Sequence, residues 1–430
     1  MLQGHSKFED EQAQDGGGAA PRVGAERGGD VGRAALSASA IGKVLTSALL
    51  DAALAVASRR RRLRCRKLPL RFMLLFCMLI YLSADEALPA VFLHLAGRWA
   101  GSATRLLVSA SALCQVRYCL GVRPVEALFR RVCQPLATAQ MPGAFLFGRR
   151  LFAVDSTKLD VPDSPANVAA FGRHHAWRGT SAWPQVRLVL LVECGTHAVC
   201  DAGVWPCNMD EGRAGRRLLR SVGPRALVLW DRGFQSVEMM EATTGCSADF
   251  LGRLPATVRP LPLRQLADGT SLVALRPGWM RHRRRGDQVV ARLIRYTLDD
   301  PRRPGHWIEH RLVTTLLDPT AAPARKLILA YHQRWENELV VDELKTHQGP
   351  ARPCRSQRPV GVLQEIYSLL IAHYLLRALA VTAAHSAQVA PTRVSFVAAL
   401  RLLRDHVVRG DWYRSPCRCV GWHLSATLST

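Results

Sequence analysis

The sequence lacks the cysteine and histidine spacing of a structural metal site. Its 12 cysteines are scattered, none of them form a CxxC pair, and no Cys/His group has the spacing of a zinc finger. Several, such as Cys77 and Cys194, lie inside apolar runs, which is typical of reduced and buried cysteines in a cytosolic protein. We therefore expect neither a zinc-stabilised nor a disulfide-stabilised fold.

The sequence also lacks a segment suited to export or to crossing a membrane. The N-terminus is polar and acidic rather than basic and then apolar, so no secretory signal peptide is expected. An apolar run at residues 72–82 follows a basic cluster at residues 59–67, but it holds only 11 residues. A spanning helix needs about 20. We interpret the run as a buried core helix and predict a cytoplasmic protein without membrane contact.

Acidic residues are few relative to basic ones. The 430 residues include 34 Asp and Glu against 58 Lys and Arg, so the formal net charge is +24. This charge predicts a polyanionic partner, for which DNA, RNA and anionic lipid are the candidates. Hydrophobic residues make up 48% of the chain, so most of it should fold, and the length is enough for two or three domains.

The first third of the chain is expected to be a tail followed by helices. Residues 1–40 are rich in Gly, Ala and charge, which predicts a disordered tail. Residues 41–140 have the pattern of helices. Within them, Ser109 is a candidate N-cap, Gly121 a helix stop, and Pro124 opens a further helix through Val132. Two helices around a glycine turn are compatible with a DNA-binding helix-turn-helix, although many all-helical domains share this pattern.

From residue 150 the pattern changes to strands mixed with helices. We predict strands at 151–159, 185–194, 197–205, 226–230, 249–254, 271–275, 288–298 and 306–317. A helix is expected near 212–221, and Asp268-Gly269 is a hairpin turn. Helices return at 323–347, 361–384 and 395–408.

Residues 331–345 carry an unusual set of side chains. If the segment is one α-helix, Tyr331, Arg334, Glu338 and Lys345 fall within an arc of roughly 60°. A carboxylate can hold a hard metal ion, and the flanking cations suit phosphate. The alternative is a solvated charged face with i,i+4 pairs. Asp342 lies one turn beyond Glu338, so helix geometry alone does not choose the carboxylate.

Two further carboxylates lie in apolar surroundings. Asp155 lies within a strand, and Asp231 follows a buried one. Buried carboxylates are costly unless they are paired, hydrogen-bonded or metal-bound, but both residues could instead cap turns. The remaining candidates adjoin turn residues or hairpin edges; they are Asp160, Asp163 and Asp201. With Glu338, the two aspartates would form a three-carboxylate site for two divalent ions, best Mg²⁺ with Mn²⁺ as a substitute.

These segments resemble the motifs of bacterial insertion-sequence DDE transposases of the family-four type. Tyr331, Arg334, Glu338 and Lys345 match that family's Tyr-x2-Arg-x3-Glu-x6-Lys motif without a gap. DSTKLDVPDSPAN at residues 155–167 is similar to its first motif, and DRGF at residues 231–234 to its second. The resemblance spans about residues 40–410. Ser156 departs from the usual glycine and should face away from Asp155 in a strand, and Tyr118 and Cys119 replace residues that are often basic.

The resemblance implies an α/β fold with an RNase H-like mixed-sheet catalytic core, at residues 150–250 and 318–385. A β-rich insertion would occupy 251–317, an all-helical DNA-binding domain 41–140, and a C-terminal helical segment 386–430. It implies Asp155, Asp231 and Glu338 as catalytic metal ligands. It further implies phosphate contacts near the cut by Tyr331, Arg334 and Lys345, and a place close to the active site for Arg253.

The implied function is a DNA transposase that cuts the terminal inverted repeats of its element and joins the freed 3′-hydroxyl to target DNA. A homodimer would bridge two DNA ends, in the bacterial cytoplasm at the nucleoid. Two alternatives stay open at this point. One is a catalytically inactive or repurposed transposase-derived DNA-binding protein, and the other is a metal-dependent nuclease without strand transfer.

Overall fold

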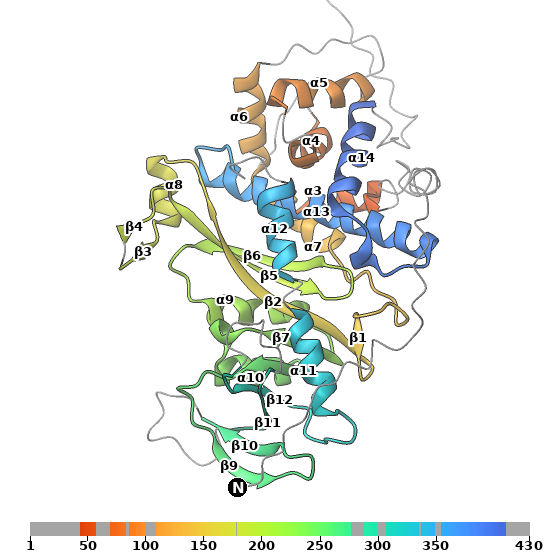
Figure 1. The fold of residues 1–430 in the computed structure, drawn as a ribbon. Coiled ribbons are helices and arrows are strands. Elements are labelled where there is room, and N and C mark those ends of the chain that lie inside the picture. Colours follow the sequence, from red (N-terminus) through yellow and green to blue (C-terminus); the bar gives the residue numbers. More distant parts are fainter. Residues whose placement is uncertain are drawn as a thin grey trace, which may run out of the picture.

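The computed structural model describes residues 44–56, 69–82, 86–99, 109–177, 179–276, 288–298, 307–334, 337–348 and 354–409. The predicted tail at residues 1–40, the basic cluster at 59–67 and the last part of the predicted C-terminal segment, 410–430, lie outside the described residues. The described chain has a helical end, a central sheet and a β-rich far end (Figure 1).

The centre of the protein is a mixed β-sheet whose strands follow the order β6-β5-β2-β7-β8-β12-β11-β10-β9, with β1 beside β2. The strands are β1 (Phe145–Leu146), β2 (Arg149–Asp160), β5 (Gln185–Glu193), β6 (Ala198–Pro206), β7 (Ala226–Trp230), β8 (Asp249–Arg253), β9 (Leu261–Gln265), β10 (Ser271–Leu275), β11 (Val289–Tyr296) and β12 (His310–Thr314). β2, β5 and β6 form an antiparallel meander, and β7 and β8 follow parallel to β2. The predicted mixed-sheet α/β core is confirmed.

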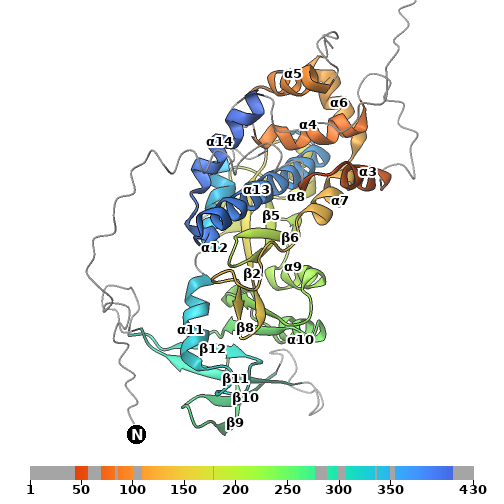
Figure 2. The ribbon, with the colours of Figure 1, turned by 90° about the vertical axis from the view of Figure 1, so that its right-hand side faces the viewer.

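Helices cover both faces of this sheet. Figure 2 shows α11 (Ala324–Gln333) on one side and α9 (Glu211–Leu218) and α10 (Val237–Gly245) on the other. Successive side chains of a strand point to opposite faces. Accordingly, the core beneath α11 takes Leu151 and Ala153 of β2, whereas Phe152 and Val154 belong to the core on the other face.

The strands of the predicted insertion extend the central sheet. β12 pairs antiparallel with β8, and β11, β10 and β9 follow in turn. The predicted turn at Asp268-Gly269 joins β9 to β10, and Gly269 has a φ of +82°, which a residue with a side chain rarely adopts. β8 spans residue 250, the predicted boundary between the catalytic core and the insertion. The two parts therefore share this strand.

A helical layer lies at the other end of the molecule. It contains α3 (Ser47–Ala55), α4 (Leu70–Leu82), α5 (Leu88–Trp99), α6 (Ala110–Leu120), α7 (Arg123–Val132), α13 (Pro359–Ala387) and α14 (Phe396–Arg409). Every residue from Phe72 to Leu82 is buried, and α4 packs against α13, so the apolar run is a core helix as predicted. Among the described helices, α13 is long and apolar enough to cross a membrane, but 83% of its apolar window is buried inside the protein.

The predicted signals around α6 and α7 are present. The Ser109 hydroxyl accepts a hydrogen bond from the Ala112 amide at 3.2 Å, and Gly121 ends α6 with a φ of +72°. α7, however, buries Leu128 and Phe129 against neighbouring helices that include α3 and α13. Most of this second helix is therefore core, and the helix-turn-helix interpretation stays a prediction.

The prediction of one uninterrupted α-helix over residues 331–345 is wrong. α11 ends at Gln333, α12 covers Asn337–Asp342, and a π-helical segment, η4, covers Glu343–Gln348. The π-helical segment packs into the core, since Glu343 and Leu344 are buried and η4 contacts α13 and α14. A π-helix has a wider turn than an α-helix, so a constant 3.6-residue period does not hold across the segment.

Candidate active site

Asp155 and Asp231 lie side by side, Asp155 within β2 and Asp231 directly after the last residue of the parallel strand β7. Val154 of β2 pairs with Trp230 of β7, so the next residue of each strand is one of the two aspartates. Ala153 and Leu229, two residues before the aspartates, both contribute to the core beneath α11. The alternation of a strand therefore directs both carboxylates toward the α11 face.

Asp231 does not act as a turn cap, which was the alternative interpretation of this residue. Asp231 precedes the short 3-10 helix η2 (Arg232–Phe234), but its side chain makes no capping hydrogen bond. The Tyr331 hydroxyl lies 3.5 Å from Asp231 Oδ1 and 3.4 Å from the Trp230 carbonyl oxygen, toward which it donates. α11 thus places a phenol directly over the second aspartate.

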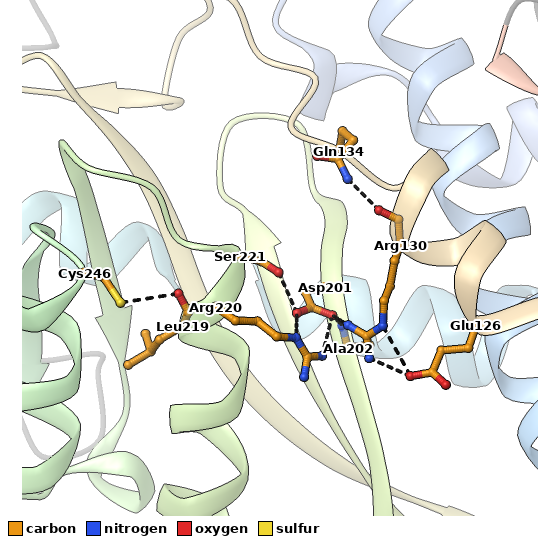
Figure 3. Close-up of polar contacts among 9 residues, drawn as sticks. All are labelled: Glu126, Arg130, Gln134, Asp201, Ala202, Leu219, Arg220, Ser221 and Cys246. Carbon is orange, nitrogen blue, oxygen red and sulfur yellow. Dashed lines mark hydrogen bonds and ion pairs between the residues drawn. The ribbon is translucent and has the colours of Figure 1, made fainter. Parts of the chain in front are cut away.

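Asp201, one of the other candidate carboxylates, has a structural role. It is buried between α7 and the turn after α9, where it accepts hydrogen bonds from Arg130 at 3.0 Å and Arg220 at 2.9 Å (Figure 3). Ser221 donates a further bond at 2.7 Å. Asp163 pairs with Arg173, and Asp160 accepts from Gln185, so these acids also have structural partners.

The charges of Asp231, Arg334 and Glu338 act on Asp155, although all three lie more than 70 residues away along the chain. Burial raises the pKa of the Asp155 carboxyl above its ordinary value of 3.8, and repulsion from Glu338 and Asp231 raises it further. The Ser156 amide, which donates to Asp155 Oδ1 at 2.8 Å, and the Arg334 guanidinium lower the same pKa. Fold topology therefore brings both aspartates, Glu338 and Arg334 to one place.

These carboxylates are neighbours rather than a preassembled cluster. Asp155 and Asp231 are half-buried on the sheet, whereas Glu338 is exposed on α12. Among the described residues, no three His, Cys, Asp or Glu side chains lie close enough to hold one metal ion together. The donors are nevertheless all carboxylate oxygens that repel one another, and such a set fits a hard divalent cation.

Arg334 and Arg253 lie near Tyr331, the residue whose hydroxyl faces Asp231. Burial raises the pKa of the Tyr331 phenol, which stays protonated, and the Arg334 guanidinium lies 5.6 Å from its ring centroid. Arg253 ends β8 and shares the α11 face, since Leu251 contributes to the same core. The charges of Arg334 and Arg253 both lower the Tyr331 pKa, so the two guanidinium groups lie near this phenol.

Lys345 lies elsewhere. It is on η4, where partial desolvation lowers the pKa of its ammonium group and the charge of Asp160 raises it. Asp160 ends β2, and five residues of strand from Asp155 to Asp160 span about 17 Å. The structure therefore places Lys345 beside the far end of β2 rather than at the aspartates.

Glu211 is a carboxylate near the site that the sequence did not indicate. Ser156 faces away from Asp155, as predicted, and its hydroxyl donates to Glu211 Oε1 at 2.8 Å. Arg187 also donates to this oxygen. The sequence contains no signal for this contact, because it joins residues 55 positions apart and Glu211 has the position of an ordinary first-turn acid of a helix.

The chain is similar to known transposases. A family model described as "Transposase DDE domain" matches residues 146–375, which is more than half of the chain, and one described as "Insertion element 4 transposase N-terminal" matches residues 35–130. "Transposase InsG for insertion sequence element IS4" of Escherichia coli is 29% identical over 321 residues, covering 73% of this chain and 70% of that protein. "Putative transposase InsZ" of the same species is 29% identical over 159 residues, 36% of this chain and 52% of that protein.

Among solved structures, the piggyBac transposase synaptic complex with hairpin DNA aligns with a TM-score of 0.47 and 12% identity, over 86% of this chain and 79% of that chain. The alternative of a repurposed, non-catalytic DNA-binding protein gains no support from the family models or the relatives. DDE domains cut and join DNA with divalent metal ions. The chain belongs to the family of DDE-domain transposases, enzymes that bind, cut and join DNA, and its N-terminal part is similar to that of insertion element 4 transposases.

Proposed function

We propose that Asp155, Asp231 and Glu338 are the catalytic carboxylates and hold two divalent ions, Mg²⁺ with Mn²⁺ as a substitute. One observation carries the proposal: Asp155 follows the pair Val154–Trp230 beside Asp231 and is repelled by both Asp231 and Glu338. When bound, such ions activate the attacking oxygen and stabilise the leaving oxygen of a phosphodiester. The enzyme would first free a 3′-hydroxyl at each element end and then join it to target DNA.

The protein groups around the site have separate roles. The sheet holds Asp155 and Asp231 at a fixed spacing, and Glu338, exposed on α12, would join them when the metal ions bind. The Tyr331 hydroxyl orients the Asp231 carboxylate, because it lies within 3.5 Å of Oδ1. The Arg334 and Arg253 guanidinium groups bind phosphate oxygens beside the cut, since planar guanidinium groups suit phosphate.

Lys345 would contact a phosphate farther along the same DNA strand. The distance from Asp155 to the end of β2 is about 17 Å, which is about five nucleotides at 3.4 Å per nucleotide. A DNA end lying along β2 would therefore pass the aspartates and then reach Lys345. The net charge of +24 supports extended contact with the backbone. We propose that two protomers bridge two DNA ends, and that the enzyme works in the cytoplasm at the nucleoid.

The test is cleavage of DNA that carries the terminal inverted repeat, in Mg²⁺ and in Mn²⁺. We expect Asp155→Asn, Asp231→Asn and Glu338→Gln to abolish cleavage and to retain DNA binding, because each removes a metal-ligand charge without adding bulk. Asp342→Asn is the matched control on α12, since Asp342 pairs with His347 at 3.2 Å. Cleavage by Glu338→Gln with loss of cleavage in Asp342→Asn would assign the third carboxylate to Asp342 instead.

A joining assay with pre-cut ends separates a transposase from a nuclease. We expect wild-type protein to insert a 3′-hydroxyl end into plasmid DNA and the three carboxylate variants to fail. Crosslinking of the protein on end DNA tests the dimer. A single protomer per joined pair of ends would contradict two-protomer bridging.

A further inference from the structure

Helix α9 lies directly behind the two aspartates, on the sheet face opposite α11. Asp210 caps its start by accepting a hydrogen bond from the Arg213 amide at 2.7 Å. Ala214 and Leu218 anchor the helix in the main core. Its first turn therefore has a fixed place beside the middle of β2 and the end of β7.

Glu211, the first residue of α9, contacts both aspartate motifs. Its Oε1 accepts the Ser156 hydroxyl at 2.8 Å, and Ser156 directly follows Asp155. Its Oε2 lies against Gly233, so close that a Cβ at residue 233 would be only 2.6 Å from this oxygen. Gly233 lies two residues after Asp231, so one carboxylate contacts a residue close to each catalytic aspartate.

Gly215 repeats the arrangement one turn later. A Cβ there would lie 2.8 Å from Phe234 Cδ1 and 3.4 Å from Val154 Cγ1. Val154 precedes Asp155, and Phe234 ends the 3-10 helix η2 that directly follows Asp231. Residues i and i+4 share one helix face, so the same face of α9 contacts both motifs twice.

The Glu211 carboxylate is itself held in place. Arg187 of β5 donates to its Oε1, and this guanidinium also donates to the Cys207 carbonyl oxygen at 3.4 Å. The side chains of Arg187 and Glu211 are 11% and 36% exposed. A carboxylate fixed by a mostly buried arginine can transmit its position to Ser156 and Gly233.

We propose that Glu211 is a positioning residue for the catalytic metal site, and that α9 sets the spacing of Asp155 and Asp231. The inference rests on the proposed role of these aspartates as metal ligands. It also explains Ser156, the departure from the family motif, because the Ser156 hydroxyl couples the first aspartate strand to Glu211. Partners that orient metal ligands commonly change metal affinity by about 10- to 100-fold when removed.

The experiment measures Mn²⁺ binding to the full chain by the electron paramagnetic resonance signal of free Mn²⁺, without DNA and without turnover. We expect Glu211→Ala to weaken Mn²⁺ binding about 10-fold. Ser156→Ala, which keeps the Arg187 pair, should weaken it less, and the double variant should be no weaker than Glu211→Ala alone. Asp201→Asn is the structural control; it should lower the melting temperature and leave the Mn²⁺ Kd unchanged.

The outcomes separate this inference from the proposed function. If Asp155→Asn binds Mn²⁺ as tightly as wild type, the assignment of the metal ligands is wrong. If Asp155→Asn loses binding while Glu211→Ala and Ser156→Ala keep the wild-type Kd, Glu211 has no positioning role. If Glu211→Ala does not fold, the Mn²⁺ affinities of Ser156→Ala and Gly215→Ala test the inference instead. Wild-type affinity in both variants would overturn it.

Discussion

Replacing Glu343 tests how the protein holds the helix that carries Glu338. Glu343 begins η4 and is buried against α13, where His373 Nε2 lies 2.8 Å and Arg377 Nε 3.1 Å from its Oε2. The Arg377 Nη2 group donates to Oε1. The side chains of Glu343, Arg377 and His373 are 8%, 3% and 0% exposed, so water cannot replace a lost partner.

The charges in this cluster determine the size of the effect. Burial lowers the pKa of His373 to about 3 and that of Arg377 to about 10, so at pH 7 the imidazole is neutral and the guanidinium is charged. Glu343→Ala therefore leaves a buried cation without its counter-charge, which costs about 3–5 kcal/mol. At about 2 °C per kcal/mol, the melting temperature should fall by roughly 6–10 °C.

The assay is thermal unfolding followed by circular dichroism, with cleavage measured well below the melting temperature. Because η4 directly follows α12, we expect Glu343→Ala to lower cleavage even where the protein is folded. The double variant Glu343→Leu with Arg377→Met should recover most of the lost stability, since apolar side chains can replace a buried ion pair. A melting temperature of Glu343→Ala within about 1 °C of wild type, or no recovery in the double variant, would refute the reasoning.

Two further predictions concern the site itself. Asp155→Asn should raise the melting temperature of metal-free protein at pH 7, because burial and repulsion from Glu338 and Asp231 raise the Asp155 pKa in the folded state and make its ionised form unfavourable. The gain should disappear as the pH falls below 3.8, its ordinary pKa; an equal gain at all pH values would contradict this cause. Arg253→Ala and Lys345→Ala should each make the slope of log binding constant against log salt concentration shallower by about one unit, which corresponds to the loss of one phosphate contact. An unchanged slope for either variant would show that the residue does not contact DNA.

Local sequence determined the elements that carry the site. The apolar pentapeptide at residues 226–230 is β7, and the apolar run that precedes Asp155 lies in β2, because short apolar runs suit buried strands. The Ser109 cap and the Gly121 stop likewise act within a few residues. The motif order around Asp155, Asp231 and Glu338 was sufficient to indicate the family, which the family models and relatives confirm.

Tertiary structure decided what these elements do together. The register between Val154 and Trp230, which puts the two aspartates side by side, depends on a pairing across more than 70 residues of chain. The segment after α12 is π-helical and its Glu343 is bonded to Arg377 of α13, neither of which a helical period could reveal.

The same holds for Lys345 and Glu211. Lys345 lies beside Asp160 rather than Asp155, and Glu211 contacts Ser156 and Gly233 from the opposite face of the sheet. The sequence by itself determined the chemical groups and the elements on which they lie. Only packing decided their partners, because burial and charge act between residues that the chain does not bring together.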